Sequence, residues 1–347
     1  MGGGHSSMTI ELPVFLLGFG GFPASQQQAF GHALQSASGP TQWLASDLAG
    51  ADAWWINGTR LQMAGDRTVR VPPGNPTERS LQLYLPDIDR PIAFSQPAAC
   101  PGFQPALTFD PQSQASMDRV LGKFDASLSA LTAQFCLASH VVEHQTALGT
   151  GIFDVSVNGS LVAVVDMKGD IGVMPDIGPA DLEQSIWQRR PEALPVPKQF
   201  VRTSLSQLIW QYAVRTQRDI LPPHYRKGLL YFRRPPRLPQ RMLKDSHLLL
   251  MRELATEPMS FAALMQQTGM DEAALSRALA ALYFVGAVTA NPKRAALNHR
   301  PQSRDSADST NGLHSGPPSS PDTVVPLPAP RKPRRVDLTA PAALHGY

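Results

Sequence analysis

Short apolar runs separated by turn residues open the chain, with one helical pattern among them. Residues 12–17 (Leu-Pro-Val-Phe-Leu-Leu) predict a buried strand, and residues 25–36 carry apolar side chains at helical spacing. Residues 42–45 and 52–57 predict two more strands, and residues 58–90 insert a hairpin-like stretch. A strand, helix, strand, strand order of this kind indicates an open α/β sheet.

The longest helical pattern in the first half covers residues 113–147. Met117, Val120, Leu121 and Phe124 begin a series of apolar residues spaced three and four apart. This pattern predicts a helix that packs at the end of the first domain, and a homodimer contact is its alternative role. His140 and His144 lie four residues apart, but the spacing marks no third ligand, so we expect no metal site.

Alternating apolar residues then predict a small β unit. Residues 152–157 and 161–166 flank an Asn158-Gly159 turn, the strongest hairpin signal in the chain, and residues 171–174 add a third strand. The expected result is a three-stranded meander. Residues 181–190 predict a short amphipathic helix, and three prolines between 191 and 197 predict a stiff connector.

The region 199–297 predicts a helical domain. Residues 204–214 form an amphipathic helix pattern, and residues 229–232 form a short apolar run. The proline-rich residues 233–241 predict an extended, exposed arm.

Three helices follow in this region, each with a start signal. Ser246, Ser260 and Asp271 are the expected caps, and Gly269 is the expected turn. The predicted buried residues are Leu248, Met251 and Leu254 in the first helix, Phe261, Leu264 and Met265 in the second, and Leu275, Ala278, Leu279 and Leu282 in the third. Gly286 ends the third helix before a β-prone segment at 287–289. This order resembles the winged-helix superfamily.

The first 130 residues resemble a receiver domain of the response-regulator kind. In that family, the first strand ends in two acidic residues and the third ends in the phosphorylated Asp. Here the first strand ends in Gly18-Phe19, and the third begins at Asp52 and ends at Asn57. The resemblance therefore implies a degenerate receiver, with Asn57 at the phosphoacceptor position and no carboxylates for Mg²⁺.

The β hairpin carries a second resemblance. Asp154, Ser156 and Gly159 match the D-x-S-x-x-G half of the cyclic-di-GMP site of the PilZ family. The family's R-x-x-x-R half occurs as Arg233 to Arg237 and again as Arg237 to Arg241, here after the hairpin instead of before it. Arginine planes stack on guanine and bind phosphate. The resemblance implies cyclic di-GMP as a ligand of Arg233, Arg234, Arg237, Arg241, Asp154 and Ser156.

Charge is distributed unevenly along the chain. Residues 202–252 hold eleven Lys or Arg against two Asp, a local charge of +9 in a chain of total charge +3. The remainder is therefore net acidic, which favours an anionic partner or an acidic neighbouring surface for the basic segment. Two cysteines without a pairing framework indicate a reducing cytoplasm, and no window has the length of a membrane span.

The third helix of the winged-helix-like unit is a poor candidate for reading DNA bases. Its first turn carries Asp271 and Glu272, which would repel phosphate. Only Ser276 and Arg277 follow as polar, outward-facing candidates, and the wing adds Lys293 and Arg294. These four residues are the expected contacts with DNA or, as we favour, with a protein partner.

The sequence thus predicts a fold of the α/β plus α+β class in a chain without a catalytic constellation. The expected domains are a disordered start (1–9), a receiver-like domain (10–148), a β meander with linker (150–198), a helical winged-helix domain (199–297) and a disordered tail (298–347). The expected function is that of a non-enzymatic cytoplasmic signalling adaptor without a cofactor. The alternatives are a cyclic-di-GMP effector and a DNA-binding transcriptional regulator.

Overall fold

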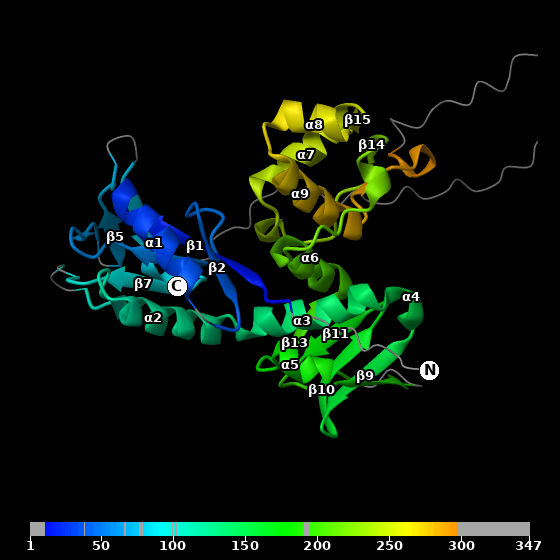
Figure 1. Cartoon of the computed structure of the whole chain (residues 1–347), viewed down its shortest axis with the longest axis horizontal. Coiled ribbons are helices and arrows are strands. Elements are labelled where there is room, and N and C mark those ends of the chain that lie inside the picture. Colours follow the sequence, from blue (N-terminus) through cyan, green and yellow to red (C-terminus); the bar gives the residue numbers. More distant parts are fainter. Residues whose placement is uncertain are drawn as a thin grey trace, which may run out of the picture. The chain divides into compact units, whose positions relative to one another are not determined.

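The structure is a computed structural model that describes residues 11–37, 39–65, 67–75, 79–98, 100, 103–190 and 195–296. The disordered segments expected at 1–9 and 298–347 lie outside these residues. A parallel sheet, antiparallel sheets and several helices make up the described part, so the expected mixed α/β content is confirmed (Figure 1).

A five-stranded parallel sheet forms from the first apolar runs. Its strands are β1 (Val14–Gly20), β2 (Gln42–Ser46), β3 (Ala53–Ile56), β7 (Ile92–Ser95) and β8 (Thr108–Phe109), in the spatial order β2-β1-β3-β7-β8. Helix α1 (Ala24–Ser36) connects β1 to β2. Counted along the chain, this is the order 2-1-3-4-5 of one group of doubly wound sheets.

The two faces of the parallel sheet are covered differently. Side chains of α1 and of the later helix α2 (Gln114–Ser127) pack on one face around Phe15, Phe19 and Trp55. The inserted segment covers the other face with a three-stranded antiparallel sheet of β4 (Gln62–Met63), β5 (Thr68–Val71) and β6 (Leu81–Tyr84), followed by the short helix η1 (Leu85–Asp87). Doubly wound sheets carry helices on both faces, so the insertion gives this sheet a different second layer.

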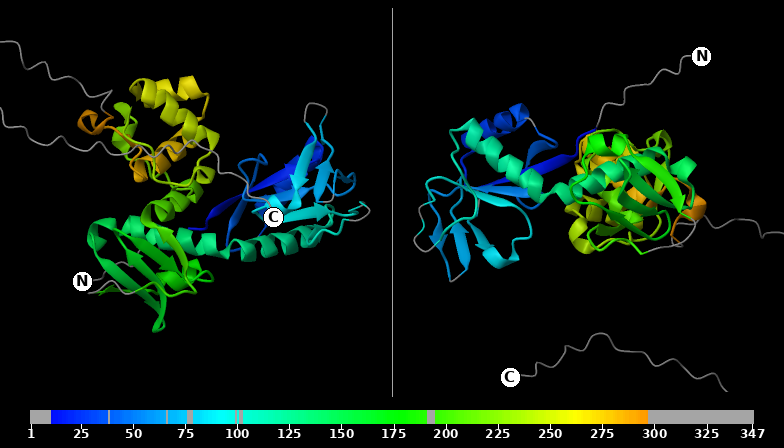
Figure 2. Two further views of the ribbon diagram at one scale, coloured as in Figure 1. Left: turned by 180° about the vertical axis from the view of Figure 1, so that it is seen from behind. Right: turned by 90° about the horizontal axis from the view of Figure 1, so that it is seen from below.

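The helix predicted at 113–147 is divided into α2 (Gln114–Ser127), α3 (Ser129–Glu143) and α4 (Gln145–Leu148), with α2 and α3 running end to end (Figure 2). Phe124 of α2 is buried in the core of the parallel sheet. Phe135, Leu137 and Val141 of α3 are buried in a second core. The apolar residues of these helices are therefore used within the chain, and a homodimer through them would have to use their polar faces.

The second core lies between α3 and a five-stranded antiparallel sheet. This sheet has the order β12-β9-β10-β11-β13, with β9 (Ile152–Val157), β10 (Ser160–Asp166), β11 (Asp170–Val173), β12 (Ile186–Arg190) and β13 (Val201–Ser204). The hairpin turn is confirmed, because Asn158 and Gly159 both have positive φ angles.

Two expectations for this unit are wrong in part. The meander β9-β10-β11 is present, but β12 and β13 pair with its two sides and complete a larger sheet. The helix expected at 181–190 is only the short α5 (Pro179–Glu183), and residues 186–190 form β12 because they pair with β9. Strand β13 pairs with β11, so the sheet continues past the boundary expected at residue 198.

A helical unit with a small sheet follows. Its helices are α6 (Leu205–Arg215), η2 (Pro223–Tyr225), η3 (Gln240–Met242), α7 (Asp245–Thr256), α8 (Phe261–Thr268), α9 (Glu272–Phe284) and η4 (Pro292–Arg294). Its strands are β14 (Leu229–Phe232), β15 (Met259–Ser260) and β16 (Val288–Thr289), in the order β15-β14-β16. The strand that pairs with β16 thus precedes α7, whereas the expected wing would have followed β16.

Local signals for α8 and α9 are confirmed, and those for α7 are not. Ser260 and Asp271 cap their helices with side-chain oxygens, and Gly269 adopts the left-handed conformation between them. Helix α7 begins one residue before Ser246, with Lys244 at the cap position. Its buried face holds His247, Leu250 and Leu254, while the predicted core residue Leu248 is 40% exposed.

Helix α6 contributes to more than one core. Leu208 and Tyr212 pack in the core of the antiparallel sheet, and Trp210 and Ala213 pack in the core of the helical unit. Arg215, near its end, forms an ion pair with Asp52 at 2.6 Å. No helix in the described part of the chain has both the length and the apolar character that a membrane span requires.

Candidate functional site

The carboxyl edge of the parallel sheet is the usual place for ligands and chemistry in sheets of this order. Asn57 lies there, directly after β3. Its amide nitrogen donates to the carbonyl oxygen of Gly21 at 2.9 Å, and its amide oxygen accepts from the backbone and the hydroxyl of Thr59 at 3.0 and 2.7 Å. Every polar atom of the Asn57 side chain is therefore engaged in holding the end of β1 and its own loop.

The backbone around Asn57 is closely packed. The Gly58 N–H donates to the buried hydroxyl of Ser95 at 2.9 Å, and a Cβ atom on Gly58 would lie 2.0 Å from the Ser95 carbonyl oxygen. A Cβ atom on Gly74, in the insertion, would lie 2.0 Å from the carbonyl oxygen of Phe22. The ends of β1, β3 and β7 are thus joined through amides, a hydroxyl and backbone groups.

The basic arm, residues 233–241, is fixed to the helical unit. The Arg233 N–H donates to the carbonyl oxygen of Ala287 at 2.8 Å and so continues the pairing of β14 with β16. Leu238 packs against the core of the helical unit, as do Met242 and Leu243 just beyond the arm. Three prolines restrict the backbone between these anchors.

The four arginines of the arm have different surroundings. A Cβ atom on Gly286 would lie 3.3 Å from Nη1 of Arg233 and 3.4 Å from Nη2 of Arg234, so both guanidinium groups lie beside the carboxyl end of α9, where a cation is favourable. Arg237 is exposed and makes no hydrogen bond or ion pair with any described residue. Arg241 is also exposed and lines a cavity of about 630 Å³.

The residues of the cyclic-di-GMP hypothesis are not brought together by any contact in the described ranges. Asp154 is held by Arg190 of the neighbouring strand, with Nη2 to Oδ1 at 2.5 Å and Nε to Oδ2 at 3.0 Å. Ser156 lies opposite Ile186 and Leu161 in the same sheet. No hydrogen bond or ion pair among described residues joins Asp154 or Ser156 to the arginines of the arm.

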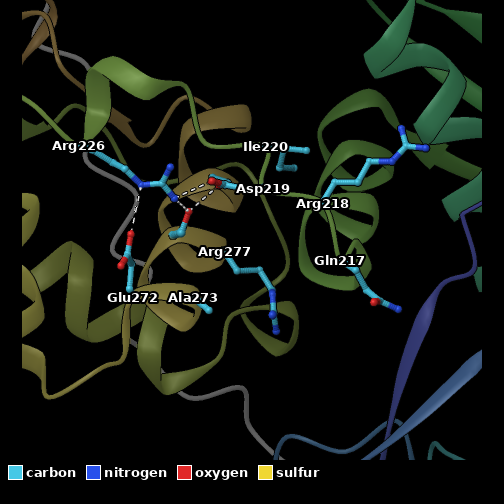
Figure 3. A pocket seen from close by; sticks show the side chains of 10 residues that line it. Gln217, Arg218, Asp219, Ile220, Arg226, Glu272, Ala273 and Arg277 are labelled. Atoms are coloured by element: carbon cyan, nitrogen blue, oxygen red, sulfur yellow. Dashed lines mark hydrogen bonds and ion pairs between the residues drawn. The ribbon is translucent and has the colours of Figure 1, made fainter.

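A pocket of about 300 Å³ lies beside the first turns of α9 (Figure 3). Nη2 of Arg226 contacts Oδ2 of Asp219 at 2.7 Å and the hydroxyl of Ser276 at 2.9 Å, and that hydroxyl donates to Oδ1 of Asp219 at 2.9 Å. Desolvation raises the pKa of Asp219, and hydrogen bonds from Arg226 and Ser276 lower it. Together the hydrogen bonds outweigh desolvation, so the pKa of Asp219 lies below its ordinary value. Ser276 was expected to face outward; it is 6% exposed and joins α9 to the segment before β14.

Arg277 extends from the same helix, and no dashed line joins it to the other residues drawn (Figure 3). The exposed residues of α9 are Glu272, Ala273, Ala274 and Arg277, all near its start, and its remaining residues are buried or half-buried.

Helices α6 and α7 both pack on α9. A helix that enters the major groove of DNA must present a free face along several turns. Helix α9 has no such face.

The remaining candidates lie apart from this pocket. Lys293 and Arg294 are exposed in η4, where the Lys293 N–H donates to the side chain of Asn291 at 3.0 Å. The rings of His140 and His144 have centroids 6.3 Å apart, and burial lowers the pKa of His140. Within the described residues, no three His, Cys, Asp or Glu side chains are grouped so as to hold a metal ion.

The chain matched no model of a known protein family, no curated protein and no solved structure. The roles of its residues therefore have to be argued from the geometry of the described part.

The roles of Asp219 and Arg190 and the position of Arg226 are not predicted by the sequence. Asp219 and Ser276 are 57 residues apart in the chain, and Asp154 and Arg190 are 36 apart. No periodic pattern could have paired them. The one available signal was that Asp219 is one of only two acidic residues within the basic segment.

Proposed function

We propose that this protein is a non-enzymatic signalling adaptor whose basic arm binds an acidic surface on a protein partner. The observation that carries the proposal is the anchoring of the arm. Leu238 within the arm, and Met242 and Leu243 just after it, pack against the core of the helical unit. Arg234, Arg237 and Arg241 of the arm are exposed. A cationic segment that is already ordered loses little conformational freedom on binding.

The parallel sheet supports a role without phosphotransfer. We infer a receiver-like domain from its strand order, and Asn57 is the residue at the expected phosphoacceptor position. An amide is a poor nucleophile, and this one is fully engaged in hydrogen bonds. In this proposal the domain regulates by binding instead of accepting phosphate.

The surroundings of α9 favour protein docking over base recognition. The exposed start of α9 carries the carboxylate of Glu272 as well as the guanidinium of Arg277. Carboxylates near a phosphate backbone are unfavourable. A protein surface can supply complementary groups for both charges. We place the adaptor in the cytoplasm, because Cys100 and Cys136 are both free and buried.

The test compares two charge reversals in the full chain. Arg234→Glu/Arg237→Glu changes the arm, and Arg60→Glu/Arg70→Glu changes two exposed cations of the inserted segment by the same charge. We expect a protein partner cross-linked from the native host to be lost with the arm variant and kept with the control variant. Retention of the partner by the arm variant would contradict the proposal.

Two further measurements separate the alternatives. Duplex DNA that binds the full chain more tightly than any protein partner, with affinity falling steeply as salt rises, would favour the DNA-binding regulator. Cyclic di-GMP that binds the wild type in calorimetry, but not the variants Arg233→Ala and Arg237→Ala, would favour the cyclic-di-GMP effector. Under the adaptor proposal neither binding is expected.

A further inference from the structure

A third cavity, of about 380 Å³, lies between the first strands of the parallel sheet and helices α6, α7 and α9. One part of its wall is apolar, with Leu16 and Leu44 from the sheet and Val214 from α6. The other part carries Arg215, Lys244 and Arg277. The wall thus combines an apolar surface with three cationic side chains and one carboxylate, that of Asp52.

The carboxylates near these cations already have partners. Asp52 accepts from the Leu16 N–H at 2.9 Å and pairs with Arg215 at 2.6 Å. Asp47 accepts from the Gly50 N–H of its own turn at 2.6 Å. Asp52 therefore balances Arg215, and neither carboxylate forms an ion pair with Lys244 or Arg277.

Lys244 and Arg277 are the two unbalanced cations. Among described residues, the ammonium group of Lys244 makes one hydrogen bond, to the carbonyl oxygen of Gly50 at 3.3 Å, and Arg277 makes none. Lys244 is an exposed residue, yet desolvation of its ammonium group lowers its pKa. Asp52 opposes that shift, while the positive charges of Arg215 and Arg277 add to it. The three cations thus lie close enough to repel one another.

Hydrogen-bond donors surround the same space. Ser246 lies in the first turn of α7, where the N–H groups of Asp245 and Ser246 have no partner among described residues, while the His247 N–H donates to the carbonyl oxygen of Lys244 at 2.9 Å. Arg215 also lines the cavity, but its Nε–H is fully buried and is therefore not presented to a ligand there. Unbalanced cations and free donors next to an apolar wall match an anionic head group on an apolar body.

We propose that this cavity binds a small organic anion, a phosphate monoester or a carboxylate, whose charged group contacts Lys244 and Arg277 and whose apolar body lies against Leu16, Leu44 and Val214. The volume is in the range of small-molecule sites. The site does not depend on the binding of a partner by the arm, since no arm residue lines it, although Arg277 also belongs to the exposed start of α9.

The experiment is calorimetry of the full chain with phenyl phosphate, benzoate and inorganic phosphate. We expect one of the two aromatic anions to bind more tightly than inorganic phosphate, because only they reach the apolar wall. The preferred head group distinguishes a phosphate ligand from a carboxylate ligand. No binding of either aromatic anion at millimolar concentration overturns the proposal.

Three variants test the residues. Arg277→Gln and Lys244→Gln keep most of the side-chain length and remove the charge, and each should weaken binding by about tenfold or more. Arg294→Gln removes an exposed cation outside the cavity and should leave the affinity unchanged. An unfolding curve for each variant separates loss of binding from loss of fold. Equal affinity in all three folded variants and the wild type contradicts the assignment.

Discussion

His247 should make the stability of the helical unit depend on pH. Its side chain is 3% exposed and lies against Trp210, with ring centroids 4.6 Å apart. Its Nδ1 accepts a hydrogen bond from the Lys244 N–H at 3.1 Å, which requires the neutral ring. Burial, aided by the positive charge of Lys244, lowers the pKa of His247 from 6.5 to about 4.

The sign and the size of the effect follow from this shift. The unfolded chain binds a proton on this residue near pH 6.5, and the folded chain binds it only near pH 4. The contribution of neutral His247 to the free energy of unfolding is therefore complete above pH 6.5 and is lost as the pH falls from 6.5 towards 4. Between neutral pH and about pH 5, linkage gives a loss of about 2 kcal/mol in the free energy of unfolding. The loss levels off at roughly 3 kcal/mol below the folded pKa.

Urea unfolding at neutral pH and at about pH 5, followed by circular dichroism, measures the loss. The matched variants are His247→Gln and His224→Gln, because His224 lies on the surface. We expect the pH-dependent loss to shrink by about 2 kcal/mol in His247→Gln and to persist in His224→Gln. Equal pH dependence in His247→Gln and the wild type would refute the reasoning.

Other predictions concern the sheet edge, the buried ion pair and two glycines. The wild-type protein should take up no phosphate from acetyl phosphate with Mg²⁺, and stoichiometric labelling would contradict the role given to Asn57. Asp52→Ala should lower the free energy of unfolding by about 3–5 kcal/mol, because Arg215 remains buried without its carboxylate. A double-mutant cycle with Arg215→Met should show that the two residues are coupled, and additive losses in the cycle would exclude this coupling. Gly269→Ala should lower the free energy of unfolding by about 1–2 kcal/mol, because φ is 68° at this residue. Gly31→Ala should raise it by about 0.5–1 kcal/mol, because Gly31 lies in the middle of α1 with open space around it. Thermal melts that give both glycine variants the same sign would reject this contrast.

Local chemistry explains where the sequence predicted structure well. At Asn158-Gly159, turn residues and alternating strands on both sides favour the same hairpin. At Gly269 and Asp271, a glycine that accepts positive φ and a short carboxylate that accepts from the Ala274 N–H determine the turn and the cap. In each case the information lies within about four residues, so no distant contact was needed.

The errors come from residues whose environment is decided by distant partners. Helical spacing allowed a face through Leu248 as readily as one through Leu250, and a histidine in the core was not expected. Residues 186–190 form a strand because β9 offers an edge for pairing. Ser276 is buried because Arg226 and Asp219 satisfy its hydroxyl.

Candidate sites were harder to predict than elements, since they depend on where cations find their counter-ions. The sequence shows that positive charge is concentrated in residues 202–252. It could not show that Arg215 is balanced by Asp52, 163 residues away, or that Lys244 and Arg277 form no ion pair with any carboxylate of the described residues. Which charges remain available to a ligand is a property of the folded chain.

Helix α6 has a consequence for how this chain can be divided. Opposite sides of these eleven residues complete the cores of the antiparallel sheet and of the helical unit, and Arg215 attaches the parallel sheet. Any fragment that ends before Leu205 leaves Phe135 without the ring of Tyr212, and any fragment that begins there loses the carboxylate of Asp52. We therefore expect the modules suggested by sequence to lose stability when they are expressed singly, because this one short helix packs in two cores and pairs with the parallel sheet.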